Sequence, residues 1–212
     1  DIDSERPSSP HLARSLDGGE TWTIEPQQIT NVEGGLTEPI DFSNPDMALQ
    51  FRGSNFFHSA DRGKSWTGPY PLLEVGRESL LARTDYIVED KSTVTAFIAA
   101  TKANGKEGQP LCIRTKDGGR TWELVGWIGQ EPPEGYGYAI MPSTVRLDNG
   151  AYLSMIRRAG VFDGARDYWI EAFLSPDNGV HWYMLDKPRI ESGGNPASMI
   201  ILQDGRIAVT YG

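Results

Sequence analysis

SLDGGETW at residues 15–22 is the first of four octets with the pattern (S/T)-x-D-x-G-x-x-W, and the others are SADRGKSW (59–66), TKDGGRTW (115–122) and SPDNGVHW (175–182). They begin at residues 15, 59, 115 and 175, so they are spaced 44, 56 and 60 residues apart. Four matches in which Asp, Gly and Trp all keep their places are very improbable by chance. The chain therefore contains one structural unit that recurs along its length.

Each octet has the residues of a tight β-hairpin turn. An Asp side chain in such a turn accepts hydrogen bonds from backbone N–H groups two residues on, and Gly adopts the left-handed backbone that the turn requires. The Ser or Thr hydroxyl holds the turn from its other side, and the Trp anchors it against neighbouring strands. The octet aspartates and tryptophans are therefore predicted to be structural rather than catalytic.

A repeat of about 40–60 residues with four strands in each unit is typical of a β-propeller. The third unit is predicted at 80–88, 93–101, 110–115 and 121–127, and the fourth at 140–147, 151–157, 168–174 and 181–185. A fifth begins with 196–202 and 206–211, while the first lacks its two opening strands. We therefore predict an all-β fold, the six-bladed β-propeller. Residues 1–212 are predicted to form a single, partial propeller domain that contains about four blade equivalents.

Composition limits the partners of the chain. It has 212 residues and a net charge of −9, which argues against binding to a nucleic acid backbone. A few arginines can still converge locally, so the charge is compatible with an anionic small ligand. No apolar run approaches the ~20 residues that a membrane span requires. The single cysteine, Cys112, excludes an internal disulfide, and its strand-like neighbours predict a buried thiol.

The octet turns also predict which face carries function. If they join the third and fourth strands, they share a face with the turns between first and second strands. The opposite face is then built by links between blades and by longer loops such as 101–109, 129–138 and 157–168, where functional residues concentrate. Arg157 and Arg158 are adjacent on a strand end, so one is expected to face the site and the other to face away. Further candidates on this face include Arg83, Asp85, Glu131, Tyr136, Tyr138 and Trp169.

Four such octets on propeller-type strands resemble the sialidase (neuraminidase) superfamily of BNR-repeat, or Asp-box, glycoside hydrolases. The resemblance covers essentially the whole chain. It implies an aspartate acid/base shortly before the first octet, a position held here by Asp3. It also implies three arginines that bind the substrate carboxylate, one of them on the strand that ends at Arg157 and Arg158. The other two arginines and the nucleophilic tyrosine would fall outside residues 1–212.

One position departs from the family pattern. Sialidases carry a glutamate near the start of the fourth blade's first strand, where it helps to ionise the nucleophilic tyrosine. Counting back from Gly150, that position is Met141. Glu131 and Glu134 lie in the preceding loop and could substitute only if the loop took a different path. The departure weakens the prediction of sialidase chemistry.

The sequence thus predicts a sialidase-like exo-glycosidase that removes terminal sialic acid or a related acidic sugar from glycans. Asp3 is the predicted acid/base, and the predicted substrate-binding residues are Arg83, Asp85, Tyr138, Arg157 and Arg158. We expect no metal or cofactor, and an exported protein of bacterial type. Two alternatives stay open: a non-catalytic glycan-binding propeller, which exposed Tyr136, Tyr138 and Trp169 rings would favour, and a protein-docking structural propeller.

Overall fold

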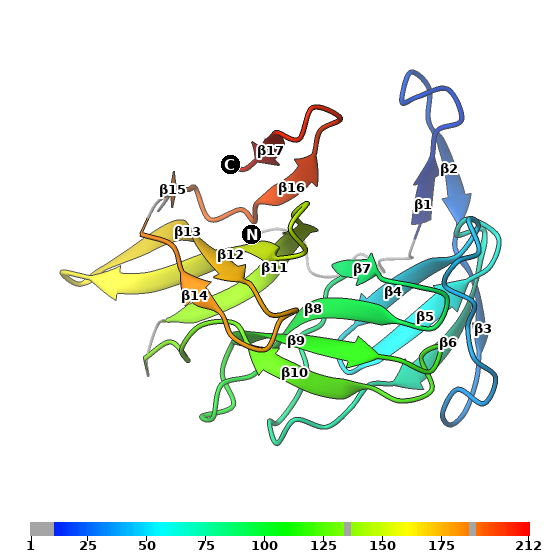
Figure 1. Cartoon of the computed structure of the whole chain (residues 1–212), viewed down its shortest axis with the longest axis horizontal. Helices are drawn as coiled ribbons and strands as arrows, with labels where there is room; N and C mark the ends of the chain where they lie inside the picture. Colours follow the sequence, from blue (N-terminus) through cyan, green and yellow to red (C-terminus); the bar gives the residue numbers. More distant parts are fainter. Residues whose placement is uncertain (1–10, 134–136, 187–189) are drawn as a thin grey trace, which may run out of the picture.

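The computed structural model describes residues 11–133, 137–186 and 190–212. These residues form strands β1 to β17 and no helix, which confirms the all-β prediction. No described segment is therefore a helix able to cross a membrane. The strands make five sheets that follow one another along an arc (Figure 1). Each sheet corresponds to one repeat unit, and we call them blades 1 to 5 in chain order.

Blades 1 and 2 depart from a simple four-stranded meander. Blade 1 is the hairpin of β1 (His11–Arg14) and β2 (Thr23–Pro26), which agrees with the predicted loss of its opening strands. Blade 2 has the order β3-β6-β5-β4, with strands at Gln28–Asn31 (β3), Ala48–Arg52 (β4), Asn55–Ser59 (β5) and Ser65–Pro71 (β6). β3 runs parallel to β6, so the chain passes directly from blade 1 to the outer edge of blade 2.

Blades 3 and 4 are the most complete, and blade 5 is a single hairpin. Blade 3 contains β7 (Tyr86–Val88), β8 (Val94–Ala100), β9 (Gln109–Thr115) and β10 (Glu123–Trp127). Blade 4 contains β11 (Tyr138–Arg146), β12 (Tyr152–Phe162), β13 (Ala165–Ser175), β14 (Tyr183–Met184) and β15 (Ile190–Glu191). Blade 5 contains β16 (Ser198–Ile201) and β17 (Ile207–Thr210). These strands overlap every strand predicted for the third to fifth units.

The predicted loop at 157–168 is wrong. β12 and β13 pair without interruption from Tyr152 opposite Ser175 to Phe162 opposite Ala165. The reversal is made by Asp163 and Gly164, whose φ angles are 50° and 79°. An Asp-Gly pair with both residues in the left-handed region forms a two-residue hairpin turn, so no long loop is needed.

The octet turns share one hydrogen-bond scheme. Each carboxylate accepts from the backbone N–H four residues on, and not two as predicted. The donors are Thr21, Ser65, Thr121 and His181, at 3.0, 2.9, 2.9 and 2.9 Å. The hydroxyl of the first octet residue donates to the Asp. It also accepts the N–H of the glycine at the fifth octet position, at 2.7–2.9 Å. That glycine has φ between 77° and 96°, a conformation that side chains with a Cβ rarely adopt.

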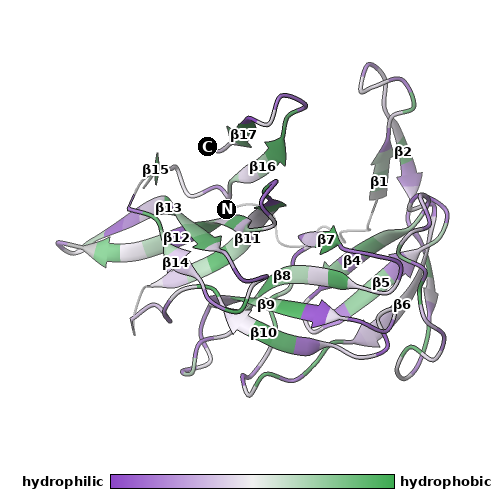
Figure 2. Ribbon diagram, in the orientation of Figure 1, coloured by the Kyte–Doolittle hydropathy of each residue, from purple (hydrophilic) through white to green (hydrophobic). Residues whose placement is uncertain are grey.

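The octet tryptophans of blades 3 and 4 join neighbouring blades. Trp122 of blade 3 packs edge-on against Phe51 and Phe56 of blade 2, with ring centroids 5.7 and 5.6 Å apart. Trp182 of blade 4 packs in the same way against Phe97 of blade 3, at 6.1 Å. Figure 2 shows hydrophobic residues along the strands and hydrophilic residues mainly in the turns. One core cluster therefore lies between blades 2 and 3, and a second lies between blades 3 and 4.

A polar network adds to the contact between blades 3 and 4. Glu89 accepts hydrogen bonds from Arg114 at 3.2 Å and from the Tyr152 hydroxyl of blade 4 at 3.0 Å. Arg114 also donates to the carbonyl of Asn178, inside the octet turn of blade 4, at 2.7 Å. Cys112 is fully buried beside this network, as predicted, and burial raises the pKa of its thiol to about 12. It is an inert core residue.

The octet turns occupy one face of the propeller. In blade 3, the Gly118 N–H of the octet donates to the Ser92 carbonyl in the turn between β7 and β8, at 3.0 Å. The turns after first and third strands are thus neighbours, which confirms the predicted face. Loops between second and third strands open on the opposite face.

Candidate functional site

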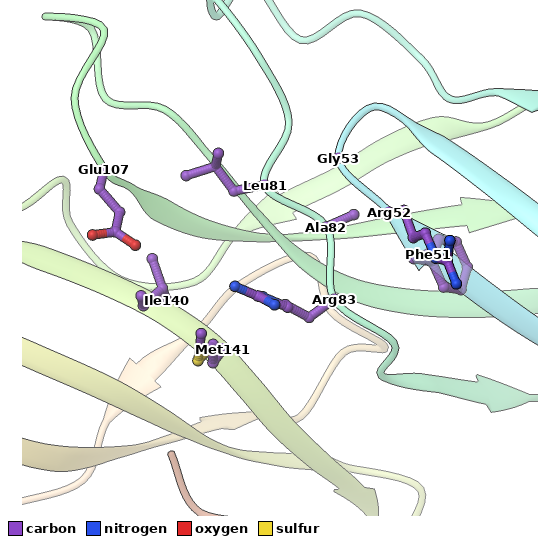
Figure 3. A pocket seen from close by; sticks show the side chains of 9 residues that line it. All are labelled: Phe51, Arg52, Gly53, Leu81, Ala82, Arg83, Glu107, Ile140 and Met141. Carbon is purple, nitrogen blue, oxygen red and sulfur yellow. The ribbon is translucent and has the colours of Figure 1, made fainter. Parts of the chain in front are cut away.

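Two adjoining hollows lie between blades 2, 3, 4 and 5. The first, of about 330 Å³, is lined by residues 51–53, 81–83, 107, 140 and 141. The second, of about 640 Å³, is lined by residues 83–85, 141–144, 157 and 194–199. Both include Arg83 and Met141, so they form one cleft, which we call the central cleft. Figure 3 shows the first hollow, with the Arg83 side chain extending toward Ile140 and Met141 and Glu107 entering from another side.

Met141 lies at a bulge in β11. Ile140 pairs with Arg157 and Ser143 with Met155, so two residues of β11 stand opposite one of β12. Pro142 in the bulge cannot donate a ladder hydrogen bond, which is where proline is tolerated in a sheet. Met141 itself has φ 53°, which is uncommon for a residue with a side chain. The bulge places a thioether in the cleft at the position where the sialidase pattern has a carboxylate.

Arg157 is the member of the arginine pair that faces the central cleft. Its guanidinium stacks over the ring of Tyr138 at 5.3 Å, and Nη1 lies 3.5 Å from the Met141 sulfur. Its Nε is buried and has no hydrogen-bond partner in the described part of the chain. Neither Arg157 nor Arg83 forms an ion pair with a described residue. Two guanidinium groups in one cleft thus lack a carboxylate from the described part of the protein.

Arg158 faces the other side of β12, as the alternation of a strand requires. Its Nε lies 3.3 Å from Oε2 of Glu171, without the alignment of a hydrogen bond, and its guanidinium covers the Trp169 ring at 5.8 Å. Glu171 also accepts the Trp169 indole N–H at 2.8 Å. Arg158 therefore packs within blade 4, and of the two arginines only Arg157 lines the cleft.

Asp85 has the most unusual environment of the acidic residues in the cleft. The residue as a whole is half-buried, but its Oδ2 atom is fully covered and has no hydrogen-bond partner among the described residues. Burial raises the pKa of this carboxyl to about 7, and the nearby polar groups of Thr144 only partly oppose the effect. A carboxyl with this pKa retains its proton close to neutral pH, which suits a general acid.

Glu107 is a cleft residue that the sequence analysis did not single out. It lies in the β8–β9 loop, lines the first hollow and is exposed. The only sequence signal was its place in a loop predicted on the functional face. Glu131, by contrast, is engaged in the protein: it pairs with Arg77 at 2.8 Å and accepts the Ala103 N–H at 3.1 Å.

Tyr138 and Trp169 do not offer their rings as sugar platforms. Tyr138 is 5% exposed and lies beneath Arg157, and Trp169 is 6% exposed beneath Arg158. Tyr138 therefore supports Arg157 from below, in place of the direct contact with substrate that was predicted. Asp3, Glu134 and Tyr136 lie outside the described residues, so the role of Asp3 stays a prediction.

Solved structures share this fold. A protein of unknown function from Dyadobacter fermentans is 18% identical, with a TM-score of 0.65 over 95% of this chain and 64% of its own. An α-L-arabinanase of Penicillium chrysogenum, complexed with arabinobiose, is 17% identical, with a TM-score of 0.63 over 95% and 67%. An α-L-arabinofuranosidase of Fusarium graminearum with an iminosugar inhibitor is 15% identical, with a TM-score of 0.61 over 95% and 66%.

This likeness shows the fold and no more, because the identities are low. The chain spans about two thirds of the length of these structures. No protein-family profile and no curated protein matches the sequence. A β-propeller is thus shown, while the sialidase type and the six blades stay predictions.

Proposed function

We propose that this chain carries the central part of a glycosidase active site, which removes a terminal acidic sugar, sialic acid or a related one, from a glycan. One observation carries the proposal: a carboxyl group that keeps its proton near neutral pH shares a cleft with two arginines that have no carboxylate partner among the described residues. The likeness in fold to an arabinanase and an arabinofuranosidase supports hydrolysis of a glycoside without specifying the sugar.

Arg83 and Arg157 bind the substrate carboxylate in this proposal. A guanidinium offers two parallel N–H groups to a carboxylate, and the partly buried Arg157 is held in place by Tyr138 beneath it. Since neither arginine is neutralised by the described residues, an anionic ligand supplies the missing charge. The net charge of −9 elsewhere does not oppose this local arrangement.

Asp85 and Glu107 divide the chemistry. Glycoside hydrolysis commonly uses two carboxyl groups, one that protonates the leaving oxygen and one that acts on the other side of the sugar. Asp85, with its raised pKa, donates the proton to the glycosidic oxygen. The Glu107 carboxylate stabilises the positive charge that develops on the sugar ring. Water then adds to the anomeric carbon and gives its proton back to Asp85, which completes the hydrolysis. The scissile bond then lies where the two hollows meet, beside Arg83 and Met141.

Asp3 is the competing proton donor, since the sialidase resemblance assigns it that role. Met141 stands where sialidases carry the glutamate that helps to ionise the nucleophilic tyrosine. A thioether cannot accept the proton of a tyrosine, so a tyrosine nucleophile would need another base. We also propose that the protein is exported, because its substrate is a glycan.

The test is turnover of fluorogenic glycosides by the full-length protein and by Asp85→Asn, Asp3→Asn and Asp148→Asn. Asp148 is a turn residue on the octet face, outside the central cleft, and serves as control. We expect hydrolysis of a sialoside or another acidic glycoside, and its loss in Asp85→Asn alone. Loss in Asp3→Asn alone would transfer the acid role to Asp3. A folded protein that turns over no glycoside would refute the enzyme and leave glycan binding or protein docking.

A second candidate is a neutral arabinosidic substrate. Ile140 and Met141 form an apolar wall in the cleft, and two similar structures act on arabinose-containing substrates by their names. An α-L-arabinofuranoside belongs in the same panel. If the arabinofuranoside alone is cleaved, the prediction of an acidic substrate is wrong and the prediction of glycosidase activity is confirmed.

A further inference from the structure

Lys102 is a buried lysine at the beginning of the β8–β9 loop. It is 1% exposed, and its Nζ donates to the backbone carbonyls of Gly137 and Pro133 at 2.7 and 3.2 Å. Both acceptors belong to the connection between β10 and β11. Burial of an ammonium group is costly unless it is hydrogen-bonded, so this side chain holds the two segments together.

Two more contacts hold the β8–β9 loop, one to the β10–β11 connection and one to β11 itself. The Ala103 N–H donates to Glu131 of the β10–β11 connection at 3.1 Å, and Arg77 pairs with the same carboxylate at 2.8 Å. The Ala139 N–H donates to the Gly108 carbonyl at 3.0 Å. The contacts of residues 102 and 103 precede Glu107 in the chain, and that of Gly108 follows it. Glu107 is therefore held from both sides.

The backbone beside Glu107 has no room to shift inward. A Cβ at Gly108 would lie 2.9 Å from Ile140 Cγ2 and 3.0 Å from Leu81 Cδ1, two residues that line the first hollow. The loop is also closed on itself, since the Lys102 N–H donates to the Lys106 carbonyl at 2.8 Å. The loop is thus pressed against the wall of the cleft, with Lys102 at its base.

We propose that Lys102 is a positioning residue, which fixes Glu107 in the central cleft by tying the β8–β9 loop to the β10–β11 connection. The inference rests on the proposed role of Glu107 in glycoside hydrolysis. Lys102 does not line the cleft; it acts through the backbone on either side of the loop. A misplacement of about 1 Å at a catalytic group can lower the rate about 100-fold.

Lys102→Met tests this in the full-length protein, with Lys106→Met as the matched control. Lys106 is an exposed lysine of the same loop. We expect kcat to fall about 10- to 100-fold in Lys102→Met with little change in KM, and to be unchanged in Lys106→Met. The double variant Lys102→Met/Glu107→Gln should be no slower than Glu107→Gln alone, because Lys102 acts through Glu107. Losses that multiply in the double variant would overturn the proposal.

Amide exchange, which needs no substrate, tests the positioning role of Lys102 independently of the proposed glycosidase activity. Amide exchange at Ala103 and Ala139 should speed up in Lys102→Met, while that of Ile98 in the core of β8 stays unchanged. Unchanged exchange at both alanines would overturn the proposal, whatever the activity. If Glu107→Gln is fully active but exchange does speed up, the role of Glu107 fails and with it the positioning role. If Lys102→Met does not fold, Lys102→Gln, whose side chain is shorter and uncharged, decides by the same measurements.

Discussion

The octet aspartates and Asp85 are the same side chain in opposite environments. The pKa values of Asp17, Asp61 and Asp177 are lowered to about 2, chiefly by hydrogen bonds from the residue four positions on. Burial opposes this effect at Asp117, yet hydrogen bonds from Thr121 still leave its pKa lowered. The pKa of Asp85 is raised to about 7, because its carboxyl is covered and one oxygen lacks a partner among the described residues.

The two faces of the propeller thus treat a carboxyl group differently. On the octet face, every octet carboxylate receives an N–H and a hydroxyl or imidazole group, so its charge is stabilised and its proton is unavailable. On the cleft face, the donors around Asp85 are too few to stabilise the charge, so the proton stays available. A carboxyl group becomes reactive where the fold withholds hydrogen bonds from it.

The largest expected effect is on activity, which should depend on Asp85 and not on the octet aspartates. Asp85→Asn should lower kcat by about 10²–10⁴-fold, the usual contribution of a general acid. Asp61→Asn should leave kcat unchanged at a temperature where the variant is folded. Steady-state rates on the substrate found in the glycoside panel give both values. A fully active Asp85→Asn variant would show that Asp85 is not the general acid.

The next effect is a dependence of stability on pH. The folded chain keeps the Asp85 proton up to about pH 7, whereas the unfolded chain releases it near pH 4. The free energy of unfolding should therefore fall as pH rises from 4 to 7, by at most about 4 kcal/mol. Asp85→Asn should remove this loss, so the variant should gain stability relative to the parent at pH 8. Urea unfolding of both proteins at pH 5 and pH 8 measures it.

A smaller effect belongs to the octet face. Asp61→Ala removes hydrogen bonds to Ser59 and Ser65, and we expect a loss of about 2 kcal/mol in the free energy of unfolding. Because the pKa of Asp61 is lowered, the stabilisation is complete above pH 4 and is lost as pH falls toward 2. The deficit of the variant should shrink in acid. Asp148→Ala is the control, and an equal loss there would contradict this explanation.

The smallest effect tests one turn against the others. Asp177 has a His181 Nδ1 at 2.6 Å where the other octets offer a Ser or Thr hydroxyl. The backbone N–H of His181 is the main cause of its lowered pKa, and that bond does not depend on the side chain. His181→Ser should therefore change the free energy of unfolding by less than about 0.5 kcal/mol. A loss above this value would mean that the imidazole stabilises the turn.

The octets made most of the fold predictable. Their spacing indicated the blade order and the strands of blades 3 to 5, since turn chemistry is local. The long β12–β13 hairpin was missed although its signal, Asp163-Gly164, is present in the sequence. The outer strand β3 could not be foreseen, because its parallel pairing with β6 depends on residues far apart in the chain.

The site was predictable only in part. Strand alternation correctly separated Arg157 from Arg158. The raised pKa of Asp85 was beyond the sequence, because burial in the folded chain causes it, and Thr144, which partly opposes the effect, lies on β11 nearly 60 positions away. Burial of Tyr138 under Arg157 and the entry of Glu107 also depend on packing between blades. A residue type gives a chemical possibility, and its neighbours in space decide whether it is used.

The tryptophans have a consequence for how such chains can arise. Trp122 and Trp182 each seat their own blade on the blade before it. A repeat copied within a gene would therefore arrive with the side chain that attaches it to its predecessor. Trp22, on blade 1, is 62% exposed and marks the same surface without such a neighbour among the described residues. Growth by duplication would then reuse the aromatic contact that Trp122 and Trp182 already make, without a new interface.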